Sequence, residues 1–320
     1  MKKQYISDEK AGLSTMRDPM VMVHGDTYYL TGTQPPYWDG YNDGVHLWSS
    51  KDMISFTYHG LILKRSDMTE DMWCVDRFWA PELFDGKDGW FYLTFNCKNK
   101  SEKYYHTQAC GLARSRNVTG PYEILTPDTP LTEKQGHAND AHLFRDDNGE
   151  MWFASNIARL GGQTLHKIDL EKAELGEFIL VGGVGEEGEW DHVGVEGACI
   201  VKRHGIYFHW YSSWTLDYDG GVFTTDNVST YRSGIFTSDS MRGPWIKSPQ
   251  NPILDSNGIW HKAGHNHSFT GLDGKDYIIF HANLKQPDGE DVERIFIRRV
   301  DYLPDGTVKI YENIGFGEQE

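Results

Sequence analysis

Short hydrophobic runs, rich in aromatic and β-branched residues, recur along the whole chain and alternate with turns rich in glycine, proline and aspartate. This alternation is the pattern of β-strands joined by tight turns. No long stretch carries the hydrophobic period of an amphipathic helix. The pattern therefore predicts an all-β protein.

One part of the pattern occurs five times: a turn glycine, followed within a few residues by aromatic or β-branched strand residues. The copies start at Gly25, Gly89, Gly149, Gly205 and Gly274, and the glycines are 56 to 69 residues apart. A sixth copy would fall beyond the last residue. Repeats of this length and composition are typical of a β-propeller in which each repeat is one blade. We expect residues 1–320 to form a single five-bladed β-propeller domain.

Each repeat also carries a polar side chain seven to nine residues before its glycine. These residues are Asp18, Glu82, Asp140, Glu196 and His265. If the aromatic run is the second strand of a blade, they lie on the innermost strand and converge at one mouth of the central channel. Crowded like charges push pKa values apart, which gives acid and base roles to one residue type. The alternative is a set of solvated strand-edge carboxylates, since the chain has 47 acidic residues.

Composition narrows the class of partner. A 13% aromatic content suits a sheet interior and also a sugar-binding surface, whereas a net charge of −16 argues against nucleic acid or an anionic membrane. No segment reaches the length of a membrane span, and the first ten residues lack the apolar run of a signal peptide. We expect a cytoplasmic protein, or a secreted one if a leader has been removed. The four cysteines lack CxxC spacing, which favours buried free thiols over a zinc site or a disulfide framework.

Six short segments, in this order and at blade spacing, resemble glycoside hydrolase family 43. They are Arg17-Asp18-Pro19, Trp79-Ala80-Pro81-Glu82-Leu83, Asn139-Asp140-Ala141-His142, Val195-Glu196-Gly197-Ala198, Gly264-His265 and Arg294-Ile295-Phe296-Ile297. The resemblance covers nearly the whole chain. It implies a five-bladed propeller and an inverting enzyme that cleaves arabinofuranosides, β-xylosides or some galactosides.

The resemblance also implies roles for three carboxylates. Asp18 would be the general base that activates water, Glu196 the general acid, and Asp140 the third carboxylate that raises the pKa of the acid. A glycosidase needs one carboxyl protonated and one ionised at the same pH, so this assignment agrees with the chemistry. The structural alternatives are a turn aspartate before proline for Asp18, an Asx-turn for Asp140 and a solvated strand end for Glu196.

Three further residues would bind substrate. Arg294 matches a family arginine that pairs with sugar hydroxyls or a catalytic carboxylate, with a surface ion pair as the alternative. Trp79 would form an aromatic wall of the pocket, or else belong to the core. His137 would reach a sugar hydroxyl, with a structural role equally open.

His265 resembles a family histidine on the propeller axis that contacts a calcium ion through water. Here the sequence departs from the usual Gly-His-x-Ser, because Gly264-His265-Asn266-His267-Ser268 has one residue more. Either His265 or His267 could therefore be axial. Their His-x-His spacing could ligate a transition metal, and two histidines without metal is the alternative. No cofactor is expected for the chemistry itself.

The resemblance thus predicts an exo-acting glycoside hydrolase that releases a terminal pentose from plant-derived oligosaccharides, foremost an α-L-arabinofuranosidase. A β-xylosidase or β-galactosidase of the same fold is the nearest alternative, since the two pentoses present similar hydroxyls. A non-catalytic carbohydrate-binding propeller is the alternative from another class. The presence of all three expected carboxylates favours the enzyme.

Overall fold

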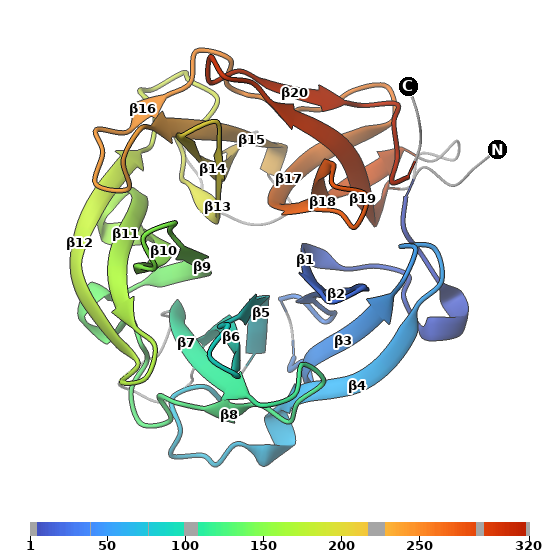
Figure 1. Ribbon diagram of the computed structural model, residues 1–320, viewed down its shortest axis with the longest axis vertical. Coiled ribbons are helices and arrows are strands. Elements are labelled where there is room, and N and C mark those ends of the chain that lie inside the picture. The colour runs from blue at the N-terminus through green and yellow to red at the C-terminus, as the bar shows by residue number, and fades with distance from the viewer. Residues whose placement is uncertain are drawn as a thin grey trace.

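A computed structural model describes residues 5–38, 40–75, 77–98, 108–216, 228–285 and 291–317. Within these ranges the strands form five four-stranded antiparallel sheets. The sheets stand like blades around a central axis (Figure 1). The prediction of an all-β, five-bladed β-propeller is therefore confirmed.

Each blade is a meander of four strands that are consecutive in sequence. The blades consist of β1 (Arg17–His24), β2 (Thr27–Thr33), β3 (Gly44–Ser50) and β4 (Thr57–Lys64); β5 (Arg77–Asp85), β6 (Phe91–Lys98), β7 (Gln108–Ser115) and β8 (Glu123–Ile124); β9 (Ala138–Arg145), β10 (Met151–Ile157), β11 (Gly162–Asp169) and β12 (Glu174–Gly183); β13 (Glu196–Arg203), β14 (Ile206–Leu216), β15 (Val228–Ser238) and β16 (Ile246–Lys247); β17 (Trp260–Thr270), β18 (Asp276–Lys285), β19 (Asp291–Tyr302) and β20 (Val308–Tyr311).

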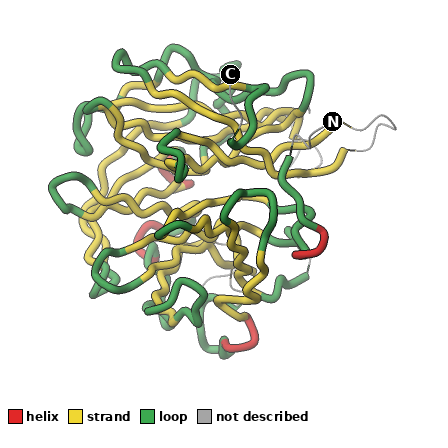
Figure 2. Tube along the Cα trace, turned by 45° about the vertical axis from the view of Figure 1, so that its right-hand side comes forward, coloured by secondary structure: helices red, strands yellow, loops and turns green. Residues whose placement is uncertain are grey.

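Helix in the described ranges is limited to single turns, which are short red segments in the tube of Figure 2. They are the 3₁₀ turns η1 (Glu9–Ala11), η2 (Arg65–Asp67), η3 (Glu133–Gln135) and η4 (Ala158–Leu160). None of the described helices has the length and apolar character needed to cross a membrane.

The repeat glycines close the hairpin between the first and second strand of each blade. All five have a positive φ, between 61° and 85°, a conformation that glycine adopts without steric cost. The aromatic run that follows is the second strand, as the sequence pattern predicts. The first strands of neighbouring blades lie next to one another around the axis, so the first strand is innermost.

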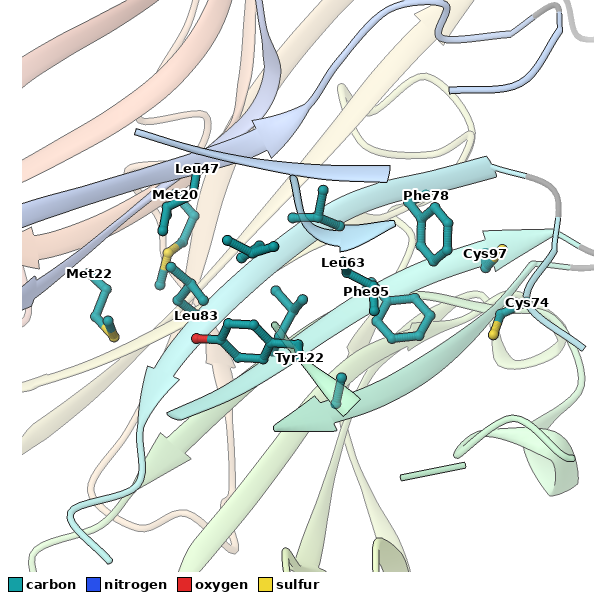
Figure 3. Packing of buried hydrophobic residues seen from close by; sticks show 14 of the residues in the cluster. Met20, Met22, Leu47, Leu63, Cys74, Phe78, Leu83, Phe95, Cys97 and Tyr122 are labelled. Atoms are coloured by element: carbon teal, nitrogen blue, oxygen red, sulfur yellow. The ribbon is translucent and has the colours of Figure 1, made fainter. Parts of the chain in front are cut away.

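The hydrophobic core is divided among the junctions between blades. The described residues form five buried clusters, and each cluster draws its members from two adjacent blades. Between the first two blades, Phe78 and Phe95 pack at one end and Met20 and Leu83 at the other (Figure 3). Burial of these faces holds each blade against its neighbours.

An N-terminal arm closes the ring between the first and fifth blades. Ile6 forms a backbone bridge with Ile295 of β19. Leu13 and Met16 are fully buried in the cluster that joins the two blades. The arm therefore supplies apolar contacts at the junction between the first and fifth blades.

Replacing Leu13 with alanine should destabilise this closure. The side chain is 0% exposed, and deleting a buried leucine side chain costs about 2–5 kcal/mol of unfolding free energy. Equilibrium urea denaturation measures the loss. As a control, Leu303→Ala removes a leucine that is 37% exposed and should change stability by no more than about 0.5 kcal/mol. Equal losses in the two variants would contradict a closing role for the arm.

Candidate active site

Each innermost strand is interrupted by an irregularity at the same place in its ladder. The pairing with the second strand shifts there in all five blades. At the shift stands one residue with φ between 42° and 71°: Asp18, Ala80, Asp140, Gly197 and His265. Bulges of this kind re-aim side chains and concentrate near functional sites. The bulge level is therefore where the blades present their polar groups.

The register corrects one part of the sequence prediction. Glu196 stands one residue before the bulge residue of its strand and still faces the cavity with Asp18 and Asp140. Glu82 stands two residues after Ala80, hydrogen-bonds to His142 and lines a different cavity. The expectation that Glu82 joins the other carboxylates at the mouth is wrong, because equal spacing to the glycine does not mean equal register.

His265 links two of the carboxylates. Its Nδ1 lies 3.2 Å from Oδ1 of Asp18 and 3.7 Å from Oδ2 of Asp140. Asp140, His265 and Glu196 each offer a ligand or proton-accepting atom within 4.8 Å of one another. All four residues line a cavity of about 60 Å³. The structure thus brings together the three carboxylates and the histidine that the sequence singled out.

Asp18 is surrounded by cationic and donor groups. Thr33 donates a hydrogen bond of 2.6 Å to its Oδ2. Burial alone would raise the pKa of Asp18, but the attraction of His265 and Arg17, together with the hydrogen bond from Thr33, outweighs it and holds the pKa below its usual value. Asp18 is therefore ionised at neutral pH.

Asp140 and Glu196 form a close pair whose protonation differs from that of Asp18. Asp140 accepts hydrogen bonds from Asn96 Nδ2 (2.7 Å) and from the backbone N–H of Gly197 (2.8 Å). Glu196 accepts one from the Tyr231 hydroxyl (2.6 Å). Burial and the nearby charge of Asp140 raise the pKa of Glu196 to about 7. Burial and the charge of Asp18 also raise the pKa of Asp140, but its two N–H donors favour its ionised form, so the proton of this close pair resides on Glu196.

Above the carboxylates lies a larger cavity of about 490 Å³. The two cavities share Arg17, Trp38, Gln108, Asn139 and Glu196 in their walls, so they are continuous. Glu196 faces both spaces, while Asp18 and Asp140 lie in the smaller one. The arrangement is a cavity that leads to buried carboxylates.

The predicted substrate residues fall in different places. Trp79 is nearly buried and lines the smaller cavity, with its Nε1–H donating to the Tyr37 carbonyl at 2.8 Å. His137 lines the larger cavity. The structure does not bring Arg294 to either described cavity: its guanidinium lies 5.4 Å from the centre of the Tyr5 ring.

The alternation of side chains along β19 explains why Arg294 does not reach the cavity. Successive side chains of a strand face opposite sides, and the neighbouring Glu293 is the residue that lines the larger cavity. Glu293 lies 3.6 Å from the Arg17 guanidinium. Arg17 thus lines the cavity in place of Arg294. Its position beside Asp18 in the first motif could have indicated this from the sequence.

Two further residues were missed because the sequence carries no distinct signal for them. The backbone N–H of Asp18 donates to Nδ1 of His281 at 3.1 Å, which fixes that nitrogen as an acceptor. The Tyr231 ring stacks on His281, with centroids 5.4 Å apart. A Cβ at Gly264 would lie 2.4 Å from the Tyr231 ring. The glycine of the Gly264-His265 motif therefore makes room for the tyrosine that contacts Glu196.

The residues at the carboxylate level fit a calcium ion poorly. Calcium takes six to eight oxygen ligands, whereas the described cluster offers two carboxylates and an imidazole. Both oxygens of Asp140 and one of Glu196 already accept hydrogen bonds. The hydrolytic chemistry of these carboxylates needs no such ion, and the axial calcium stays a prediction.

Two carboxyls with pKa values displaced in opposite directions, beside a cavity in a five-bladed propeller, match the base and acid that glycoside hydrolysis needs. The model of the family "Glycosyl hydrolases family 43" matches residues 13–308. The chain belongs to this family and is a glycoside hydrolase.

Named relatives show the range of the family around this sequence. The chain is 26% identical over 308 residues to the extracellular exo-alpha-(1->5)-L-arabinofuranosidase of Cellvibrio japonicus, covering 83% of this chain and 78% of the relative. It is 28% identical over 312 residues to a beta-D-galactofuranosidase of Aspergillus niger, covering 91% and 81%. The solved structure of a thermostable family-43 glycoside hydrolase matches with a TM-score of 0.76 at 24% identity, over 97% and 96% of the two chains. That likeness concerns the fold.

Removing the charge of Asp140 should lower the pKa of Glu196. In Asp140→Asn the amide keeps the shape of the side chain but no longer repels the charged form of its neighbour. The pKa of Glu196 should fall from about 7 toward the ordinary glutamate range, as carboxyl-detected NMR titration can measure. Asp147→Asn, whose side chain is 80% exposed, is the control and should leave this titration unchanged. An unchanged titration in Asp140→Asn would show that burial alone sets the pKa.

Proposed function

We propose that this chain is an exo-acting, inverting glycosidase with Glu196 as general acid and Asp18 as general base. The observation that supports the proposal is the opposite displacement of their pKa values: Asp18 lowered, Glu196 raised to about 7. At neutral pH one carboxyl is then ionised while the other still carries a proton in a substantial fraction of molecules. This is the pairing that glycoside hydrolysis requires.

In the proposed reaction Asp18 takes a proton from a water molecule, and the water oxygen attacks the anomeric carbon. Glu196 gives its proton to the glycosidic oxygen as the bond from that oxygen to the anomeric carbon breaks. The Tyr231 hydroxyl donates to Oε1 of Glu196, so Oε2 is the oxygen left to carry the proton. Asp140 raises the pKa of the acid and, through the Gly197 N–H, holds the start of β13 in place.

The exo mode and the pentose preference rest on the cavity and on the relatives. The 490 Å³ cavity lies in the usual range for a small-ligand pocket. Glu196 lines this cavity, which leads into the smaller one that holds Asp18 and Asp140, and this depth suits a terminal sugar. The Cellvibrio relative is named an exo-acting arabinofuranosidase. We infer an α-L-arabinofuranosidase acting on oligosaccharides.

A cytoplasmic location and the absence of a nucleic-acid partner stay predictions.

A panel of nitrophenyl glycosides tests the sugar. We expect the α-L-arabinofuranoside to give the highest kcat/KM, with the β-D-xyloside and β-D-galactofuranoside slower. A highest value for the xyloside would assign the chain to the β-xylosidases instead. Binding of sugars without hydrolysis of any panel member would favour a carbohydrate-binding propeller.

Glu196→Gln should affect substrates according to their leaving groups. General acid catalysis contributes about 10²–10⁴-fold, so hydrolysis of natural oligosaccharides should fall by that factor. Nitrophenyl glycosides need little protonation of the leaving oxygen and should lose less. Steady-state kinetics on both substrate types makes the comparison. Equal losses would contradict the role of Glu196 as the acid.

The pH dependence of kcat/KM should follow the two carboxyls. Activity requires Glu196 protonated and Asp18 ionised, so it should decline as the pH rises above about 7. The acid limb should lie below the ordinary aspartate range, because the pKa of Asp18 is lowered. Since the hydrogen bond from Tyr231 lowers the pKa of Glu196, Tyr231→Phe should move the basic limb to higher pH. Movement of that limb to lower pH would contradict the assignment.

A further inference from the structure

A second level of side chains lies on the axis, directly beyond the bulges. In every blade the first regular pair after the bulge joins an innermost-strand residue to the second strand. These residues are Met20, Glu82, His142, Cys199 and His267. Five equivalent positions therefore carry a thioether, a carboxylate, a thiol and two imidazoles. The proposed hydrolysis uses none of them.

Three of these side chains are close enough to share one ion. His142, Cys199 and His267 are all buried, and one ligand atom from each lies within 4.8 Å of the other two. In a tetrahedral zinc site, bond lengths of about 2.0–2.3 Å place such atoms about 3.3–3.8 Å apart. Small side-chain rotations would suffice to close the site. Two nitrogens and a sulfur are a donor set that zinc favours.

Glu82 orients one of the imidazoles. Its Oε2 lies 2.7 Å from Nδ1 of His142, which places a proton on Nδ1 and leaves Nε2 as the atom free to ligate. Carboxylate–histidine pairs of this kind accompany metal-binding histidines and fix the ring and its tautomer. Glu82, which does not lie with the other carboxylates at the mouth, thus orients His142 one level below them.

The other imidazole has a buried nitrogen without a partner. His267 is only 7% exposed, and its Nδ1 is inaccessible to solvent and lacks a hydrogen bond. A buried polar atom without a partner costs free energy. An adjoining cavity of about 220 Å³ is lined by Met20, Glu82, His142 and His267. It gives an ion a route inward and room for a water molecule as fourth ligand.

We propose that His142, Cys199 and His267 bind one zinc ion on the propeller axis, with Glu82 as the carboxylate behind His142. The charges balance: Zn²⁺ binds the Cys199 sulfur, the thiol proton leaves to solvent, and the thiolate together with the Glu82 carboxylate neutralises the two positive charges. The ion joins the third, fourth and fifth blades at the axis. The site is separate from the hydrolytic carboxylates and does not depend on the function proposed for them.

Cobalt substitution tests the site in the full-length protein. Metal-free protein, prepared by dialysis against a chelator, is titrated with Co²⁺ and then with Zn²⁺. We expect one ion per chain, a thiolate-to-cobalt charge-transfer band, and displacement of the cobalt by zinc. A cysteine thiol is mostly protonated at neutral pH and must lose its proton to bind zinc, so zinc uptake should release about one proton per ion. The thermal midpoint should rise with zinc concentration.

Variants identify the ligands. Cys199→Ser and His267→Gln should each abolish the charge-transfer band. Cys74→Ser is the matched control, because Cys74 is equally buried but lies in the cluster between the first two blades (Figure 3). It should keep the band. Circular dichroism checks that each variant is folded, and the wild-type titration decides the matter if one is not.

Three results would overturn the proposal. They are the absence of stoichiometric binding to the wild-type chain, a bound cobalt ion without a thiolate band, and a band that survives in Cys199→Ser.

Discussion

The site depends on three carboxylates that lie close together and are stabilised unequally by neighbouring charges and hydrogen-bond donors. His265 lies 3.2 Å from Asp18 and 3.7 Å from Asp140, so its imidazole attracts both charges. Asp18 has Thr33 as a further donor, and Asp140 has two N–H donors. Glu196 has the neutral hydroxyl of Tyr231. Because buried like charges cannot all remain ionised, the least compensated carboxyl keeps the proton. That inequality separates the proposed acid from the proposed base.

The propeller creates the crowding through its backbone. Five innermost strands run side by side around the axis, and at the same level each has a residue in the left-handed region. Asp18, Asp140 and His265 occupy that position themselves, while Gly197 brings its N–H to Asp140. One level farther along, regular pairing resumes and presents a different set of polar groups. A single repeated irregularity thus divides the axis into a carboxylate level and a level of nitrogen and sulfur donors.

Much of this could be predicted from the sequence, for identifiable reasons. The turn glycines and aromatic runs report local strand structure, so they give the blades and the innermost strands. The placements of Glu82 and Arg294 could not be predicted in the same way, since each depends on register. A bulge shifts Glu82 to another level, and strand alternation turns Arg294 toward Tyr5 while Glu293 faces the cavity. Tyr231 and His281 reach the site through packing against Gly264 and Asp18, which no local pattern encodes.

The central claim is that Asp18 activates water on one side of the sugar while Glu196 protonates the leaving oxygen on the other. Proton NMR of the sugar first formed, recorded before mutarotation, tests it most directly. A base and an acid that admit a water between them, about 6.5–9.5 Å apart, invert the anomeric configuration. The account therefore predicts a product of opposite configuration to the substrate. A product of retained configuration would mean a covalent glycosyl-enzyme, and would contradict the role given to Asp18.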